Sequence, residues 1–133
     1  MNRKSVAVMS IRPRHASRIF AGTKPYEFRR RASGIASGTR ILIYETAPVS
    51  AVTGEAAVEV VRAGSASELS SLEPEAAERE TVLAYLGGAR SPVALGLSGV
   101  VRYEKPKSLL EIGVAHAPQS YQFVEDPWDT SRS

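Results

Sequence analysis

With 133 residues, of which 43% are hydrophobic and 23% charged, the chain is expected to form one globular domain over residues 1–125, followed by a flexible tail over residues 126–133. It contains no cysteine, which excludes disulfides, thiolate catalysis and thiolate zinc sites. No apolar run approaches the ~18 residues that span a bilayer, so we expect a cytoplasmic protein without a membrane partner.

The net charge of +3 is unevenly distributed along the chain. Residues 1–31 hold nine of the 17 Lys and Arg residues and a single acid, whereas the remainder is acidic overall. A basic end on an otherwise acidic domain indicates a face that meets an anion, such as nucleic acid or phosphate. The alternative is an ordinary solvated surface.

A strand, a helix and a second strand are predicted at residues 5–11, 13–21 and 25–31. Pro13 suits the first helical turn, and Gly22 is placed to end the helix as a left-handed C-cap. Because side chains alternate along a strand, Glu27, Arg29 and Arg31 are expected on one face of the second strand.

Further strands are predicted at residues 40–46, 52–61, 92–104 and 121–124, and a helix at 74–86. Gly54 marks a bulge or a close approach of another segment. Ser65 with Glu68, and Ser108 with Glu111, have the spacing of capping boxes over short helices.

In the helix at 74–86 the candidate buried positions are Ala76, Ala77, Leu83 and Leu86. The acids at its start are explained by the helix dipole alone. The order of elements does not alternate as in doubly wound α/β proteins. We therefore predict an α+β fold, a closed or half-closed barrel with the helices outside.

Several short motifs together resemble an ASCH domain, a branch of the PUA-like superfamily, over nearly the whole chain. They comprise residues 10–13, 16, 19, 22–24, 27–31, 41–44, 47–49, 54–55, 101–103 and 117–121. The resemblance implies a PUA-like mixed β-barrel of about five to six strands with two to three peripheral helices. It also implies a cleft near the G-x-K-x-x-E-x-R element that binds RNA or a nucleotide-like ligand.

Members of this family are described as RNA-binding or transcription-coregulator modules, and some are ribonucleases. Others are amidohydrolases that deacetylate N4-acetylcytidine with a lysine, a threonine three residues on and a later glutamate. Lys24 matches that lysine, Glu27 stands at the threonine position, and Glu80 is a candidate for the later glutamate. If the chain is an enzyme, Lys24 and Glu27 are thus the candidate catalytic residues.

The residues themselves support a site in the same stretch. Lys24 follows a glycine-capped helix end, where its ammonium could lie over a pocket mouth as a point charge. Glu27 and Arg29 are close enough to pair and could hold a base edge and a phosphate. The alternative is a structural ion pair that closes one end of a barrel.

A phosphate track is a further hypothesis, and solvated surface arginines are its alternative. The candidate nucleic-acid-binding residues are Ser10, Arg12, Lys24, Glu27, Arg29, Arg30 and Arg31, with Arg14 also considered. Ser10 could instead satisfy a helix start with its hydroxyl, or act as a nucleophile beside a base.

The remaining candidates are weaker. Tyr26, Phe28 and Tyr44 could stack on bases, but core positions are favoured for Phe28 and Tyr44. His15 could be a general base, or a surface or capping residue; with His116 as the other histidine and no cysteine, no metal or other cofactor is expected. The sequence leaves two hypotheses: a small RNA-binding, possibly regulatory, module, or a hydrolase acting in the same cleft on RNA or an acylated nucleoside.

Overall fold

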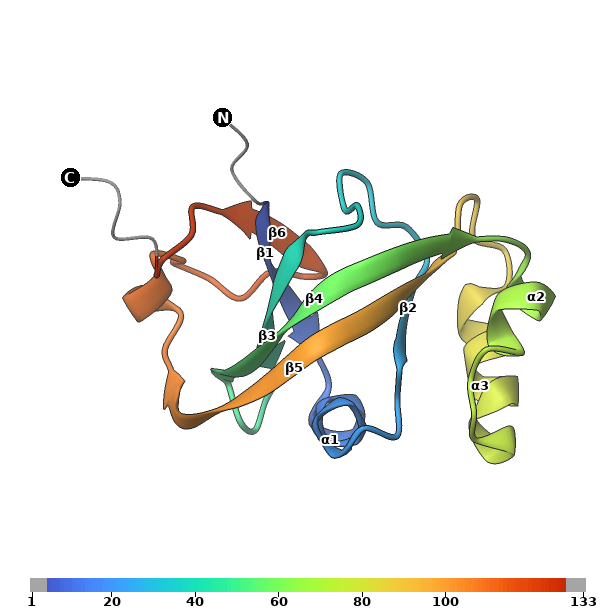
Figure 1. The fold of residues 1–133 in the computed structure, drawn as a ribbon, viewed down its shortest axis with the longest axis horizontal. Coiled ribbons are helices and arrows are strands. Elements are labelled where there is room, and N and C mark those ends of the chain that lie inside the picture. Colours follow the sequence, from blue (N-terminus) through green and yellow to red (C-terminus); the bar gives the residue numbers. More distant parts are fainter. Residues whose placement is uncertain (1–4, 129–133) are drawn as a thin grey trace.

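The computed structural model describes residues 5–128, which form a curled, mixed sheet with helices packed against it (Figure 1). Within these residues the sheet has six strands in the order β2-β5-β4-β3-β1-β6. Strands β1 and β3 are parallel, and the other neighbouring pairs are antiparallel. The strands are β1 (Val6–Ile11), β2 (Tyr26–Arg29), β3 (Arg40–Glu45), β4 (Ala51–Ala63), β5 (Val93–Lys107) and β6 (Tyr121–Val124).

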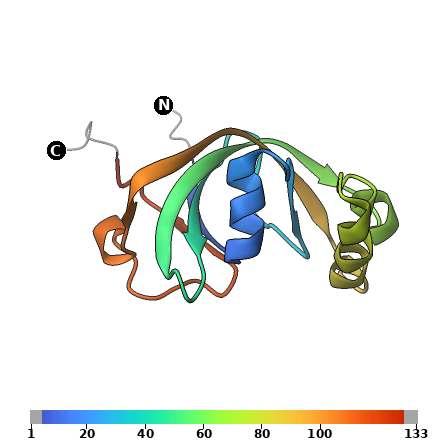
Figure 2. The ribbon, with the colours of Figure 1, turned by 90° about the horizontal axis from the view of Figure 1, so that it is seen from below.

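The helices are α1 (Pro13–Ala21), α2 (Ala66–Ser70), α3 (Ala76–Leu86) and the short 3₁₀ helix η1 (Leu110–Ile112). Figure 2 shows the long β4–β5 hairpin arching over α1, so that the sheet is a half-barrel around this helix. Helices α2 and α3 lie at one end of the hairpin, away from α1 (Figures 1 and 2). The α+β class and the half-closed barrel are confirmed.

The sheet can curl because glycines and register shifts interrupt the β4–β5 ladder. The pairing shifts between Val52 and Gly54, and again further along the hairpin. A Cβ atom at Gly54 would lie 2.5 Å from the Phe20 ring and would also collide with the carbonyl oxygen of Val101. The predicted bulge or close approach at Gly54 is therefore confirmed in both senses.

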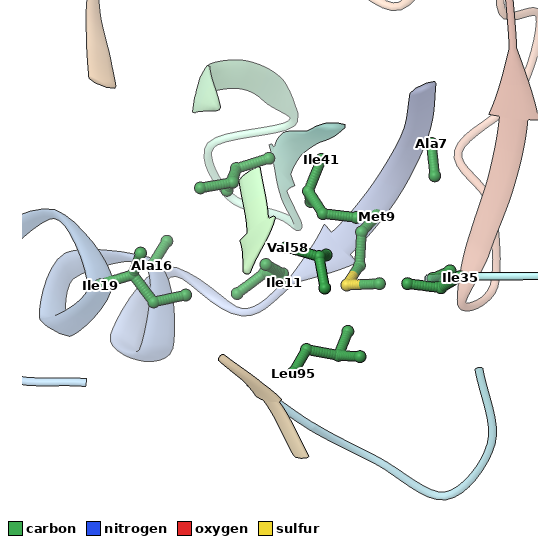
Figure 3. Packing of buried hydrophobic residues seen from close by; sticks show 10 residues of the cluster. Ala7, Met9, Ile11, Ala16, Ile19, Ile35, Ile41, Val58 and Leu95 are labelled. Atoms are coloured by element: carbon green, nitrogen blue, oxygen red, sulfur yellow. The ribbon is translucent and has the colours of Figure 1, made fainter. Parts of the chain in front are cut away.

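The main core lies between the sheet and α1. Ala16 and Ile19 point from α1 towards strand side chains such as Met9 and Leu95, all at most 2% exposed (Figure 3). Burying a side chain the size of Ile or Leu contributes about 1.5–3 kcal/mol. This packing fixes α1, and with it the two ends of the helix from which site residues extend.

The helix ends form as their sequences predict. Gly22 adopts φ 81° and its N–H caps α1, and Ser65 with Glu68 forms both hydrogen bonds of a capping box at α2. Ser108 and Glu111 make the same reciprocal pair before η1. These capping motifs involve only a few neighbouring residues, so they can be predicted without knowing how the rest of the chain folds.

The expected burial of α3 is wrong at three of its four positions. Leu86 is buried, but Ala76, Ala77 and Leu83 are exposed, and Val82 is the second buried residue. The helix rests on the edge of the sheet through Val82 and Leu86, one turn apart, against Phe28, Leu69 and Ala94. A helix that covers a sheet edge needs only this narrow stripe, and its other faces meet solvent.

Strand β2 ends at Arg29, two residues before its predicted end. Arg29 pairs with Val93, the first residue of β5, so no partner strand continues beyond it. Arg30 instead hydrogen-bonds the end of α3, through Nη1 to the carbonyl oxygens of Tyr85 (2.6 Å) and Gly87 (3.0 Å).

The first residues of the expected C-terminal tail contact the body of the domain. Asp126 pairs with Arg40 at 3.0 Å, and the Trp128 ring lies 6.0 Å from that of Tyr103. Residues 129–133 of that tail lie outside the described residues. None of the helices in residues 5–128 is both long enough and apolar enough to cross a membrane.

Candidate functional site

A pocket of about 330 Å³ lies where β1 leads into α1, with β2 as a second wall and α3 as a third. Among the residues that line it are Ser10, Arg12, His15, Glu27, Arg29 and Tyr85. Four of the predicted site residues therefore meet here, namely Ser10, Arg12, Glu27 and Arg29. Of the other three, Lys24 is buried and does not line this pocket, and Arg30 and Arg31 line a different hollow.

Glu27 and Arg29 form the ion pair that their spacing on β2 predicts. Arg29 Nε lies 3.2 Å from Glu27 Oε2, and both residues are 8% exposed. The N–H of Arg29 Nε is not aligned for a hydrogen bond, so within residues 5–128 this buried donor has no hydrogen-bond partner. A buried donor without a partner is costly in a folded protein, and a ligand that accepts from it would remove that cost.

Arg29 also connects three distant segments of the chain. Its Nη2 donates to the carbonyl oxygen of Ser10 at 2.8 Å, and its Nη1 lies 3.5 Å from Ser120 Oγ. Ser10 Oγ in turn donates to the carbonyl oxygen of Pro118 at 2.6 Å. The hydroxyl of Ser10 therefore binds the segment before β6 and does not cap α1, whose N-cap residue is Arg12.

Lys24 is buried instead of lying over the pocket mouth as predicted. It is 5% exposed, and its Nζ lies 3.8 Å from Glu73 Oε1 and 4.9 Å from the centre of the Phe28 ring. Burial lowers the pKa of Lys24, and the charges of Glu27 and Glu73 partly oppose that change. The ammonium thus lies between two carboxylates, one of which lines the pocket.

Glu73 was not predicted as a site residue, because the acids before α3 were assigned to the helix dipole. It is fully buried and accepts hydrogen bonds from Arg18 Nη2 (2.8 Å), Arg18 Nη1 (3.3 Å) and the Glu75 N–H (2.9 Å). Burial alone would raise the pKa of Glu73, but these bonds and the charge of Lys24 hold it below its ordinary value. Glu80, the predicted later glutamate, is exposed on α3 and does not line the pocket.

His15 lines the pocket from the first turn of α1. Its Nδ1 is buried and has no hydrogen-bond partner within residues 5–128. Burial lowers the pKa of His15, the positive charge of Lys24 lowers it further, and the negative charge of Glu27 opposes this change. The imidazole is therefore neutral near neutral pH and keeps one nitrogen able to accept a proton.

The arginines predicted as one phosphate track are divided by the structure. Arg12 is exposed at the pocket, and Arg14 pairs with Glu78 across to α3. Arg30 and Arg31 are exposed at the second hollow, beyond the end of β2. Across the described part of the chain, no group of three His, Asp or Glu side chains is placed to hold a metal ion.

The aromatic residues of the stretch are mainly structural. Phe28 is 5% exposed and packs with α3, and Tyr44 is 7% exposed and packs with Val52 and Ile112 in a separate cluster. Their predicted core positions are confirmed. Tyr26 is half-buried and lies beside Phe28 and Arg62.

The fold and the pocket resemble those expected of a small ASCH-like domain, and comparisons with known proteins agree in the fold. No family model matches the sequence. A curated protein named "ASCH domain-containing ribonuclease", from Zymomonas mobilis subsp. mobilis, is 43% identical over 63 residues, which are 47% of this chain and 43% of that protein. The matched segment thus spans less than half the length of that relative.

Solved structures extend the similarity to nearly the whole chain. The crystal structure of ASCH from Zymomonas mobilis covers 90% of this chain and 87% of that one, with 28% identity and a TM-score of 0.76. A tyrosine-to-phenylalanine mutant of ZmASCH covers 94% and 93%, also with 28% identity, and gives a TM-score of 0.80. The chain is thus similar to ASCH domain proteins in sequence and in fold.

Proposed function

We propose that this protein binds RNA and takes one nucleotide into the pocket between β1, β2 and α3. The observation that carries the proposal is the Glu27–Arg29 pair, which is buried and yet lines an open pocket. At about 330 Å³ the pocket is at the lower end of the range of small-ligand sites, roughly 300–1,000 Å³. The relative named as a ribonuclease supports RNA as the ligand class.

The polar groups of the pocket suit the parts of a nucleotide. The carboxylate of Glu27 only accepts hydrogen bonds, so it favours a base with an exocyclic amine, as in cytosine or adenine. Arg12 is exposed beside the start of α1, where the positive end of the helix dipole adds to its charge. A phosphate next to the bound base is attracted to this side of the pocket.

Cleavage of RNA in the same pocket is the second candidate function. It is favoured by Lys24, a buried lysine whose pKa is lowered and which lies between two carboxylates. In this reaction Glu27 takes the proton from a 2′-hydroxyl, whose oxygen bonds to phosphorus as the bond from phosphorus to the 5′-oxygen breaks. The guanidinium groups of Arg12 and Arg29, which line the pocket, stabilise the phosphoryl oxygens, and the buried Lys24 acts on the Glu27 carboxylate through its charge. A water molecule gives a proton to the leaving 5′-oxygen, and protonated Glu27 returns its proton to the hydroxide that remains.

The same geometry also admits an acylated nucleoside as substrate. The resemblance to amidohydrolases requires a glutamate besides the lysine, and Glu73 is the carboxylate found beside Lys24. Glu27 in place of the threonine is the departure from that pattern. An acylated nucleoside is therefore included among the substrates to be tested.

The test incubates the purified protein with labelled single-stranded RNA and with N4-acetylcytidine, and measures retention and product formation together. If the protein only binds, Glu27→Gln changes the preference among bases and no product forms with any variant. If it is a hydrolase, Glu27→Gln lowers turnover by about 10²–10⁴-fold while RNA retention stays near the wild-type value.

Two results decide against the proposal. Wild-type protein that retains no RNA contradicts the binding function, and turnover that survives both Glu27→Gln and Lys24→Met removes the pair from the mechanism. Because Lys24 is buried, the Lys24→Met variant is first checked for a wild-type circular dichroism spectrum. Glu80→Gln, an exposed acid on α3, is the matched control and leaves retention and turnover unchanged.

A further inference from the structure

A second hollow, of about 340 Å³, lies beyond the ends of β2 and α3. It is lined by Arg30, Arg31 and Arg90, together with small residues of the loops at positions 33, 88, 89 and 91. Among residues 5–128, no acidic residue lines it. We call it the arginine groove.

The charges of these three arginines are not neutralised by a described carboxylate, whereas those of several other arginines of the domain are. Arg14, Arg18 and Arg40 each form an ion pair with a carboxylate. Within residues 5–128, no carboxylate lies within ion-pair distance of any of the three guanidinium groups of the arginine groove. Like charges brought together without a counter-charge repel each other, and an anion bound among them removes that cost.

A purely structural role accounts for one of the three. Arg30 donates through Nη1 to the carbonyl oxygens of Tyr85 and Gly87, and so complements the negative end of the α3 dipole. That contact also holds the guanidinium in place. Arg31 and Arg90 make no such bond to the described residues, and both are exposed.

Tyr85 joins the arginine groove to the nucleotide pocket. It lines the pocket, is 44% exposed, and has its carbonyl oxygen bound by Arg30 of the arginine groove. Tyr85 thus presents an exposed side chain at the pocket, and its main chain is bound by an arginine of the arginine groove. Proteins hold successive bases of a single strand by stacking them on exposed aromatic rings while the phosphates meet positive charges.

We infer that the arginine groove binds the phosphates of a single-stranded RNA that leaves the pocket across Tyr85. This inference rests on the proposed function, because the strand starts from the nucleotide in the pocket. It adds that the ligand is a polymer of at least two nucleotides, and that Arg31 and Arg90 bind its backbone. A free nucleoside or mononucleotide occupies the pocket alone.

The experiment compares cytidine and adenosine monophosphates with single-stranded RNA octamers of mixed sequence, by calorimetry and fluorescence anisotropy at a series of salt concentrations. The variants are Arg31→Ala, Arg90→Ala and the double variant, none of which removes a described contact. For a single strand each phosphate contact contributes about 0.7 to the slope of log affinity against log salt. We expect each single variant to lower the octamer slope by about that amount and mononucleotide affinity to stay within about twofold.

Lys105→Ala is the matched control, since it removes one exposed positive charge on β5 outside both hollows. Arg31→Lys keeps the charge and is expected to keep the slope. The inference is overturned if the double variant binds the octamer with the wild-type affinity and slope, or if Lys105→Ala lowers the slope as much.

The failure of the proposed function gives a different result. If Glu27→Gln alters neither the preference among bases nor turnover while the arginine variants still lower the octamer slope, the pocket is wrong and the arginine groove stands. If wild-type protein binds neither ligand, both proposals fall.

Discussion

The Glu73 carboxylate offers the sharpest test of how the site is held together. Its side chain is 1% exposed, against 15% for Arg18, with 2.8 Å between Oε2 and Arg18 Nη2 and 3.8 Å between Oε1 and Lys24 Nζ. Glu73→Gln preserves the shape but leaves two positive groups without their shared counter-charge. Removing one partner of a buried pair costs about 3–5 kcal/mol, and the partial exposure of Arg18 places this case near the lower value.

We therefore expect Glu73→Gln to lower the free energy of unfolding by about 3 kcal/mol and the midpoint of thermal unfolding by about 10 °C. Urea denaturation followed by circular dichroism measures the first quantity, and a thermal scan the second. The control is Glu75→Gln, whose side chain is 58% exposed although it lies 3.2 Å from the same arginine. A surface pair of this kind contributes less than about 1 kcal/mol.

The effect of Glu73→Gln also has a definite dependence on pH. The folded pKa of Glu73 is lowered, so its contribution is present above the pKa of the unfolded chain, about 4.3, and is lost as the pH falls through the folded value. The difference between wild type and variant is thus constant above about pH 5 and shrinks below about pH 4. If the variant is as stable as Glu75→Gln at pH 7, the buried cluster does not have the role given to it here.

The remaining predictions concern packing and protonation. Leu86→Ala should lower the free energy of unfolding, measured by urea denaturation, by about 2–5 kcal/mol. Leu83→Ala, on the exposed face of the same helix, should lower it by less than about 1 kcal/mol, and equal decreases would contradict the packing of α3. Gly54→Ala should lower stability by about 1–3 kcal/mol because its Cβ meets neighbouring atoms, and an unchanged thermal midpoint would refute this contact. The charged groups around the His15 imidazole are Arg14, Lys24, Glu27 and Glu78. In an NMR titration this imidazole should protonate with a midpoint below pH 6.5, the ordinary value, and a midpoint above 6.5 would show that it is not neutral at that pH.

Sequence reasoning succeeded where structure depends on near neighbours. The ends of α1 and α2 and the pairing of Glu27 with Arg29 follow from residues at most a few positions apart. Because side chains alternate between the two faces of a strand, Glu27 and Arg29, two residues apart, lie on the same face. No packing partner has to be known for any of these predictions.

Sequence reasoning failed where the position of a residue depends on a packing or ion-pair partner that is distant in the sequence. Which face of α3 is buried depends on the position of the sheet edge, and nothing within the helix specifies it. Lys24 and Glu73 are brought together because the segment before α3 lies beside the C-terminal end of α1, and no local motif marks Glu73 among its acidic neighbours. The buried position of Lys24 likewise depends on Phe28 and Glu73 closing over it.

The ion pair of Arg14 with Glu78 has a consequence for any measurement of binding against salt. It spans α1 and α3, two walls of the pocket, and the Arg14 side chain is 59% exposed. Exposed pairs weaken as ions screen them, over about 8 Å at physiological ionic strength. Raising the salt therefore loosens a wall of the pocket as well as releasing ions from RNA. The slope of log affinity against log salt concentration, measured for one protein, combines both effects. The number of phosphates bound therefore has to be taken from the difference in slope between two variants that both keep this ion pair.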